Sequence, residues 1–149
     1  MITFNFKKFN ELTNFELYNI LALRSEVFVV EQHCFYLDAD GKDTDALHLL
    51  GIEDNKLVAY LRLFLPNNEC KHIIFGRVLT SSLVRSKGYG KRLIQAMLDY
   101  CKNNLKSHDI HCSAQLYLKI FYESFGFKVV GDVYDDAGVP HIEMVKSKL

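Results

Sequence analysis

A short basic segment with two glycines is the clearest candidate for chemistry in this sequence. Arg85-Ser86-Lys87-Gly88-Tyr89-Gly90 follows a strand-like apolar stretch and leads directly into an amphipathic pattern, so it predicts a turn at the start of a helix. The first N–H groups of a helix lack internal partners and carry partial positive charge, which suits a phosphate or pyrophosphate. Gly88 and Gly90 would let the backbone approach such an anion without a Cβ in the way. Four residues add positive charge here: Arg85, Lys87, Lys91 and Arg92.

Two other interpretations of this segment stay open on the residues alone. It also fits a plain strand-to-helix turn with solvated lysines. A nucleotide site is a weaker alternative, because the segment lacks the G-K-[ST] of a P-loop and the full G-x-G-x-x-G of a dinucleotide site. The choice among these interpretations therefore depends on the strands and helices that surround the turn.

Hydrophobic periodicity predicts strands and helices on both sides of this turn. Short turns at Asp54-Asn55 and Pro66-Asn67-Asn68 make the strands beside them antiparallel neighbours. The central strand–helix–strand unit needs a parallel crossover, so the sheet must be mixed, with helices packed on it. The expected order is a strand at 2–6, a helix at 15–28 with Asn14 as its N-cap, a polar loop at 31–44 with about one helical turn, strands at 47–52, 57–65 and 72–80, a helix whose apolar face runs from Leu93 to Cys101, a strand at 110–114, a short helix at 116–124, and strands at 127–133 and 141–145.

Composition limits the class of protein. The chain has 149 residues, of which 49% are hydrophobic and 24% are charged, and this suits one folded domain over residues 1–149. The formal net charge of +0 argues against a nucleic-acid partner. No apolar run reaches the roughly 20 residues of a membrane span, and the N-terminus lacks a signal-peptide pattern, so a cytoplasmic protein without membrane contact is expected. Four cysteines without a C-x-x-C pair indicate free thiols, and no metal is expected because no common zinc spacing fits Cys101, His108, His111 and Cys112.

The sequence resembles the GNAT (Gcn5-related N-acetyltransferase) superfamily at two places. R-x-x-G-x-G at 85–90, between the fourth strand and the third helix, resembles the acetyl-coenzyme A signature of that superfamily. Residues 115–127 resemble its second signature, N-x-x-A-x-x-F-Y-E followed by G-F, except that Gln115 stands where Asn is usual and Leu118 where Ala is usual. The resemblance implies an α/β (α+β) fold with a mixed, mostly antiparallel sheet of about seven strands, helices on both faces, and a splay between the fourth and fifth strands. The chain is similar to the ElaA-like group at Leu23-Arg24, residues 27–32, Gly76-Arg77-Val78, Ser113-Ala114-Gln115 and Pro140-His141-Ile142.

The resemblance also implies how acetyl-coenzyme A or coenzyme A is held. The backbone of Val78, Leu79 and Thr80 would pair with the pantetheine arm like an extra strand. Amides from Arg85 to Gly90 would hold the pyrophosphate, and Gln115 would lie beside the cofactor. A backbone N–H near Leu79 would polarise the acetyl carbonyl. Tyr122 would protonate the coenzyme A sulfur as it leaves, although its spacing alone favours a half-buried structural tyrosine.

The sequence defines the acceptor side less well. Candidate general bases are Glu31, His33, His48 and His141, and a chain of water molecules is an equal alternative. Glu31 and His33 could instead lie on a solvated loop, and His48 on the open face of a strand. Arg62 and Arg77 interrupt apolar strands, so they either line a polar cleft and favour an anionic part of the acceptor or form a solvent-exposed ion pair. Arg24 is expected to be structural. The expected substrate-binding residues are Glu31, His33, Arg62, Arg77 and His141.

Two functions are consistent with these features. The first is an acyltransferase that moves an acetyl group from acetyl-coenzyme A to a primary amine of an unidentified small-molecule or peptide acceptor, by direct attack in a ternary complex. The second is a coenzyme A-binding sensor or interaction module without turnover, because a fold does not prove an activity. Exposed edges of the mixed sheet could also pair two copies into a homodimer.

Overall fold

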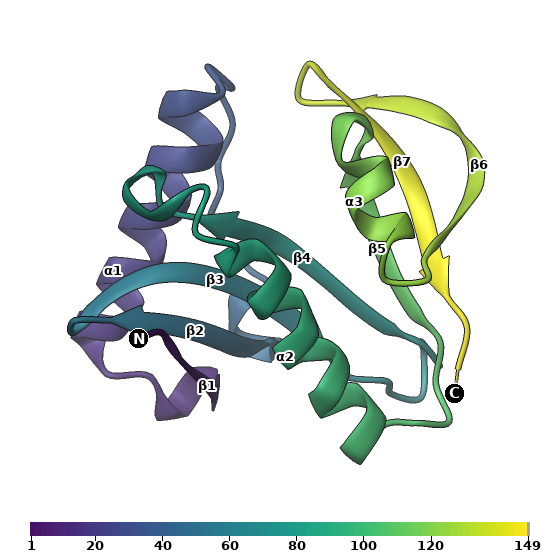
Figure 1. Cartoon of the computed structure of the whole chain (residues 1–149), viewed down its shortest axis with the longest axis horizontal. Helices are drawn as coiled ribbons and strands as arrows, with labels where there is room; N and C mark the ends of the chain where they lie inside the picture. The colour runs from purple at the N-terminus through teal and green to yellow at the C-terminus, as the bar shows by residue number, and fades with distance from the viewer. Residues whose placement is uncertain (149) are drawn as a thin grey trace.

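The computed structural model describes residues 1–148 (Figure 1). The strands are β1 (Thr3–Lys8), β2 (Leu47–Glu53), β3 (Lys56–Phe64), β4 (Ile73–Thr80), β5 (Ile110–Gln115), β6 (Lys128–Asp136) and β7 (Val139–Lys146). The helices are α1 (Asn14–Arg24), α2 (Tyr89–Asn104) and α3 (Lys119–Glu123), with a π-helical stretch η2 (Ser25–Glu31) and short 3-10 turns η1 (Phe9–Glu11), η3 (Asp43–Asp45), η4 (Ser82–Val84) and η5 (Leu116–Leu118). This is the order of strands and helices that the periodicity predicts.

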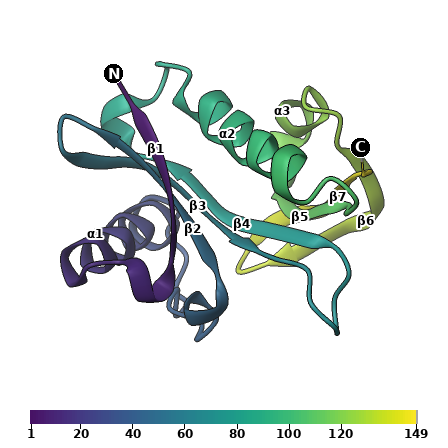
Figure 2. The same ribbon diagram turned by 90° about the horizontal axis from the view of Figure 1, so that it is seen from below.

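The sheet is mixed and divides into two arms, β1–β4 and β5–β7. Its strand order is β1-β2-β3-β4-β5-β7-β6, and all neighbours pair antiparallel except β4 and β5, which run parallel. β4 and β5 pair only at Ile73 with Ile110 and at Ile74 with His111, and they diverge beyond these residues (Figure 1). Helix α1 lies on one face of the sheet, and α2 and α3 lie on the other (Figure 2). The predicted seven-stranded, mostly antiparallel sheet with a splay between its fourth and fifth strands is confirmed.

Helix α2 is anchored by a continuous apolar face. Leu93, Ile94, Met97 and Cys101 recur at helical spacing and are buried against the sheet. Burial of each large apolar side chain contributes about 1.5–3 kcal/mol. This packing fixes the N-terminal end of α2, and the turn that precedes it, relative to β4.

A second apolar cluster covers the opposite face of the sheet. Ile20, Leu23 and Phe28, from α1 and η2, belong to the same buried cluster as Leu50 of β2 and Leu79 of β4. Leu79 is 4% exposed, so its side chain serves packing. Leu79 could therefore contact a ligand in the splay only through its backbone groups.

The beginning of α1 differs by one residue from the prediction. Thr13, and not Asn14, is the N-cap, because its hydroxyl accepts a hydrogen bond from the Glu16 amide at 3.0 Å. The Glu16 carboxylate accepts a hydrogen bond from the Thr13 amide at 2.9 Å. Together the two bonds form a T-x-x-E capping box, a pattern that the sequence already contains. The helical segment also runs further than predicted, since η2 continues it to Glu31.

Three general expectations concern membranes, thiols and metals. No helix among residues 1–148 is long and apolar enough to cross a membrane. The four cysteines are free thiols, as predicted. The same described residues hold no group of three or more His, Cys, Asp or Glu side chains arranged to bind a metal ion.

Candidate functional site

The splay leaves one edge of β4 without a strand partner. A β-bulge lies in this stretch, because Tyr60 of β3 pairs with Leu79 whereas Arg62 pairs with Gly76, which gives β4 one extra residue. Arg77 takes the left-handed conformation in the bulge, with a φ of 51°. Beyond the bulge, the side of β4 that faces away from β3 borders the opening between the two arms.

The predicted anion-binding turn, Arg85 to Gly90, lies at the open end of this edge. Gly88 caps α2 in the left-handed conformation, with a φ of 77°. The backbone amide of Arg92 is the first in the helix to find a carbonyl, that of Gly88 at 3.3 Å, so the amides of Tyr89, Gly90 and Lys91 have no carbonyl partner within the helix. The turn lines a cavity of about 220 Å³. Unpaired amides, a helix N-terminus and a lysine around one cavity fit the pyrophosphate of a coenzyme A ester.

Two of the four cationic side chains at the turn are already paired. Arg85 forms an ion pair with Glu31 at 2.7 Å and donates to the Thr80 carbonyl at 3.2 Å. Lys87 Nζ lies 3.5 Å from a Glu53 carboxylate oxygen. Lys91 lines the cavity and forms no ion pair with another described residue. The amides and Lys91 are therefore better placed than Arg85 to meet an anion.

Tyr122 lies where the two arms meet. Helix α3 places its ring near Phe75 of β4 and Phe127, which precedes β6, with ring centroids 6.0 and 5.9 Å apart. Tyr122 is 4% exposed, and burial raises the pKa of its hydroxyl, so the phenol stays neutral. That hydroxyl has no hydrogen-bond partner among residues 1–148. The site thus holds a protonated phenol whose donor is not used elsewhere.

Two polar contacts bridge the arms at the open end of the splay, which we call the mouth. Gln32, just after η2, and Gln115, at the end of β5, exchange side-chain hydrogen bonds at 3.3 and 3.4 Å. Cys34 Sγ donates to the Ala137 carbonyl, in the β6–β7 turn, at 3.3 Å. Gln115, which we expected beside the cofactor, therefore has a partner that the sequence did not indicate.

His141 brings a basic nitrogen to the mouth. It pairs with Gln115 in the β5–β7 register. Its Nδ1 lies 2.7 Å from the Val139 carbonyl, which can only accept, so Nδ1 is the donor and the neutral form of the ring has its lone pair on Nε2. The Tyr134 ring stacks on the imidazole, with centroids 6.0 Å apart. His33, by contrast, is exposed on the loop after η2, as the solvated-loop alternative predicts.

His48 is inside the protein and is wrong as a candidate base. It is fully buried, between the Tyr60 hydroxyl at 2.6 Å and the Asp43 carbonyl at 2.9 Å. Burial lowers the pKa of its imidazole. The alternative position on an open strand face is also wrong, because both ring nitrogens already have partners within the fold.

Arg62 and Arg77 neither line an anion-binding cleft nor form a solvent-exposed pair. Arg62 is 5% exposed and bonds Asp40 at 2.6 Å and Asp43 at 2.9 Å. Arg77 bonds Asp38 at 2.8 Å. This finding corrects the prediction that Arg62 and Arg77 bind the acceptor, because carboxylates of the loop between η2 and β2 already neutralise the two guanidinium groups.

Arg24 completes this network and has the structural role that we expected. It is fully buried and bonds Asp38 at 2.8 Å and Asp43 at 2.6 Å. Hydrogen bonds from Arg62 hold the pKa of Asp40 well below its usual range. Burial alone would raise the pKa of Asp43, but Arg24 and Arg62 outweigh it and lower that pKa. These ion pairs hold the loop that carries Asp38, Asp40 and Asp43 against β3 and β4, beside the bulge.

Comparison with known proteins decides the family. The sequence pattern described as "Acetyltransferase (GNAT) domain" matches residues 22–148. The chain belongs to the GNAT acetyltransferase family. The UPF0039 protein sll0451 of Synechocystis is 45% identical over 145 residues, which cover 97% of this chain and 94% of that protein. Crystal structures of Escherichia coli ElaA and of an acyl-CoA N-acyltransferase from Pseudomonas aeruginosa are each 38% identical, with a TM-score of 0.92 over 99% of this chain and 100% of theirs. The GNAT protein described here is thus an ElaA-like acyltransferase.

Proposed function

We propose that this ElaA-like protein transfers an acetyl group from acetyl-coenzyme A to a primary amine, by direct attack in a ternary complex. The observation that carries the proposal is the unpaired edge of β4, which runs from the anion-binding turn toward the buried phenol of Tyr122. Family membership supports acyl transfer. The similarity to an acyl-CoA N-acyltransferase supports a coenzyme A-linked donor and an amine acceptor.

The backbone around the splay would hold the acyl donor. Val78 to Thr80 offer main-chain groups to the pantetheine arm, as in β-strand addition. Amides of the turn, from Arg85 to Gly90 and on to Lys91, would bind the pyrophosphate. An N–H near Leu79 would polarise the carbonyl that is attacked. The buried side chain of Leu79 supports this role, because it fixes the strand in one position.

Tyr122 is the proposed donor to the leaving sulfur. Burial keeps its hydroxyl protonated. An ordinary thiol has a pKa of about 8.5, below that of a buried phenol. Tyr122 would therefore stabilise a developing thiolate by hydrogen bonding more readily than by complete proton transfer. The bond that breaks is the thioester C–S bond, and the bond that forms joins the same carbon to the amine nitrogen.

His141 is the general base that the geometry favours among the four candidates. His48 is buried, Glu31 is held in an ion pair, and His33 is exposed on a loop. The lone pair of His141 Nε2 is available to take the proton that the amine loses on attack. The bond from Nδ1 to the Val139 carbonyl would keep the ring oriented as it becomes charged.

Ligand-induced thermal stabilisation tests the donor assignment. Acetyl-coenzyme A at about 100 times its Kd should stabilise the fold by about 2.7 kcal/mol, and ATP or NAD should not. Gly90→Val should reduce this shift, because the new side chain enters the turn cavity at a residue with ordinary φ. Asn103→Val, an exposed position on the same helix, is the matched control. No shift with acetyl-coenzyme A, or an equal shift with ATP, would contradict the assignment.

An amine panel then separates catalysis from the alternative function. Release of coenzyme A that depends on an added amine supports a transferase. Tight binding of acetyl-coenzyme A without transfer to any amine of a broad panel would favour the non-catalytic sensor or interaction module.

The pH dependence of turnover tests His141. With a weakly basic amine acceptor, kcat/KM should fall on the acid side of the pH profile, because a general base works only in its unprotonated form. His141→Gln should remove this acid limb and lower kcat about 10²- to 10⁴-fold, with the affinity for acetyl-coenzyme A unchanged. His33→Gln should keep both the limb and the rate. An acid limb that persists in His141→Gln would place the base elsewhere.

A further inference from the structure

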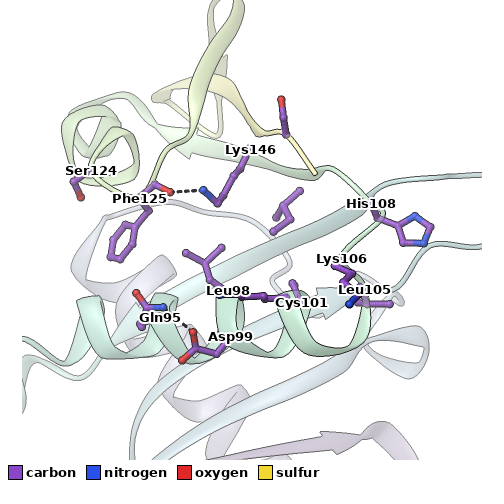
Figure 3. Close-up of a pocket in the computed structure, with 13 residues that line it drawn as sticks. Gln95, Leu98, Asp99, Cys101, Leu105, Lys106, His108, Ser124, Phe125 and Lys146 are labelled. Carbon is purple, nitrogen blue, oxygen red and sulfur yellow. Dashed lines mark hydrogen bonds between the residues drawn. The ribbon is translucent and has the colours of Figure 1, made fainter. Parts of the chain in front are cut away.

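A second cavity lies on the helical face of the protein, away from the anion-binding turn. Its volume is about 350 Å³, and its walls come from the C-terminal half of α2, the α3–β6 turn and the end of β7 (Figure 3). It shares no lining residue with the cavity at the turn. Because an α-helix rises about 1.5 Å per residue, Lys102 lies roughly 20 Å along α2 from Gly88. The proposed donor site and this cavity are therefore separate places on one helix.

Part of the lining of this second cavity is apolar. Leu98 of α2 and Phe125 project into the space between helix and sheet (Figure 3), and Ile110 of β5 lines it as well. Cys101 adds a buried thiol whose pKa burial raises to about 12, so it carries no charge at neutral pH. The volume lies near the lower end of the roughly 300–1,000 Å³ that small-molecule sites span. These walls suit a small molecule with an apolar part.

The rim of the cavity is cationic. Lys102 and Lys106 come from the end of α2 and the residues just after it, and Lys146 comes from β7. None of the three forms an ion pair with another described residue. Asp99 is the one carboxylate among the described lining residues, and it accepts a hydrogen bond from Gln95 at 2.8 Å (Figure 3). The negative C-terminal end of the α2 dipole favours a lysine such as Lys102 on the helix, but it does not explain Lys146, which comes from the other arm.

Lys146 is held at the cavity. Its Nζ donates to the Phe125 carbonyl at 2.9 Å (Figure 3). An ammonium group has three donors, so this bond leaves two for a ligand. His108, also on the rim, is tied through Nδ1 to the Lys71 carbonyl at 2.9 Å. The cavity thus has an ordered cation on the β7 side, opposite the two lysines at the end of α2.

We propose that this cavity binds a small organic anion, a carboxylate or a phosphate ester that carries an apolar group. The anionic group would meet Lys102, Lys106 and Lys146, and the apolar group would pack on Leu98 and Phe125. Such a ligand would contact α2 and the β5–β7 arm together. Its binding would therefore be able to influence how the two arms sit on either side of the splay.

Probes of matched shape and opposite charge test the proposal on the full chain. They are 2-naphthoate, 2-naphthyl phosphate and 2-naphthylmethylammonium, and binding is followed through the NMR signals of the Leu98 and Ile110 methyl groups. We expect the anions to shift these signals saturably and the cation not to, and the tighter anion identifies the preferred head group. Lys102→Ala combined with Lys106→Ala should weaken anion binding about tenfold. The matched control is Lys42→Ala combined with Lys56→Ala, which removes two exposed lysines far along the chain from the cavity lining and should leave binding unchanged.

Four results would overturn the proposal. If the cation binds as tightly as the anions, the cavity recognises only the apolar group of the probe. If Lys102→Ala combined with Lys106→Ala leaves anion binding unchanged, the two lysines do not contact the anion. Shifts confined to residues around Gly88 would place the anions at the donor turn. Displacement of the probe by saturating coenzyme A would assign the cavity to the acyl donor. The readout is binding alone, so none of these outcomes depends on whether the protein transfers acetyl groups.

Discussion

Tyr122→Phe would remove one hydroxyl group from the splay and leave the packing around it in place. The aromatic contacts with Phe75, Phe121 and Phe127 involve the ring, which phenylalanine retains. The hydroxyl has no hydrogen-bond partner among the described residues, so its loss leaves no internal group unpaired. The free energy of unfolding should therefore change by less than about 1 kcal/mol.

The same hydroxyl should matter much more to the rate. A hydrogen bond to a charged group contributes about 1.5–3 kcal/mol, which corresponds to about 10- to 160-fold in rate. Negative charge develops on the sulfur only during transfer, so the loss should appear in kcat and not in the affinity for acetyl-coenzyme A. The assay follows release of the coenzyme A thiol with an amine acceptor, beside urea unfolding of the same preparations. Tyr117→Phe, at a 72% exposed tyrosine of η5, is the matched control.

Three results would refute this reasoning. If Tyr122→Phe keeps kcat within about twofold, the hydroxyl does not meet the leaving group. If it loses several kcal/mol of unfolding free energy, the hydroxyl has a structural role that the contacts do not reveal. If its affinity for acetyl-coenzyme A falls by the same factor as kcat, the hydroxyl binds the donor in the ground state.

The remaining predictions concern stability. Asp43→Ala should lower the free energy of unfolding in urea by about 3 kcal/mol. This is the lower end of the range for breaking a buried ion pair, since both arginine partners of Asp43 keep another carboxylate. The control, Glu16→Gln at a part-exposed ion pair, should cost only about 0–1 kcal/mol. The pKa of Asp43 is depressed in the folded state, so its contribution is present above the unfolded pKa of about 3.9 and is lost as the pH falls below it; acid titration of Asp43→Ala should then show a flatter loss of stability than the unchanged protein. Gly126→Ala gives alanine a φ of 93° and places its Cβ 2.7 Å from Lys146 Nζ, so it should lower the free energy of unfolding by about 1–3 kcal/mol. Gly41→Ala is the control, because Gly41 has a similar φ of 80° but no atom lies within 4 Å of the new Cβ. Thermal unfolding of the two variants therefore isolates the cost of the contact with Lys146. If both variants lose the same stability, the Lys146 side chain moves aside freely.

Local patterns were enough to predict the parts of the site that consecutive residues build. The change from strand to helical period predicted a turn and a helix start within Arg85 to Gly90, and in the structure α2 begins inside this segment, at Tyr89. The reason for Gly88 differs from the one we expected, however. A Cβ at Gly88 would meet nothing within 4 Å, and it is the φ of 77° that favours glycine there. The Thr13 cap was also within reach of the sequence, because its capping box spans only four residues.

Contacts between distant residues could not be predicted in the same way. A charged residue such as Arg62 in an apolar strand indicates that a partner exists, but not which one. Its partner Asp43 is 19 residues away, and Gln32 and Gln115 are separated by 83 residues. His48 shows the same difficulty, since its place in the core depends on the Tyr60 hydroxyl of the next strand. Such pairings depend on how strands and loops meet in three dimensions.

The two ends of the splay are held by different forces, and this difference bears on how a donor could enter. At the closed end, the backbone pairs of Ile73 with Ile110 and Ile74 with His111 join the arms, and Ile73 and Ile110 belong to the buried core. At the mouth, side-chain bonds such as that of Gln32 with Gln115 take over, and each contributes about 0.5–1.5 kcal/mol net. A ligand that binds with micromolar affinity gains about 8 kcal/mol, several times the cost of breaking such bonds. Any widening on donor binding should therefore occur at the mouth, while the closed end and the core beneath α2 keep their positions.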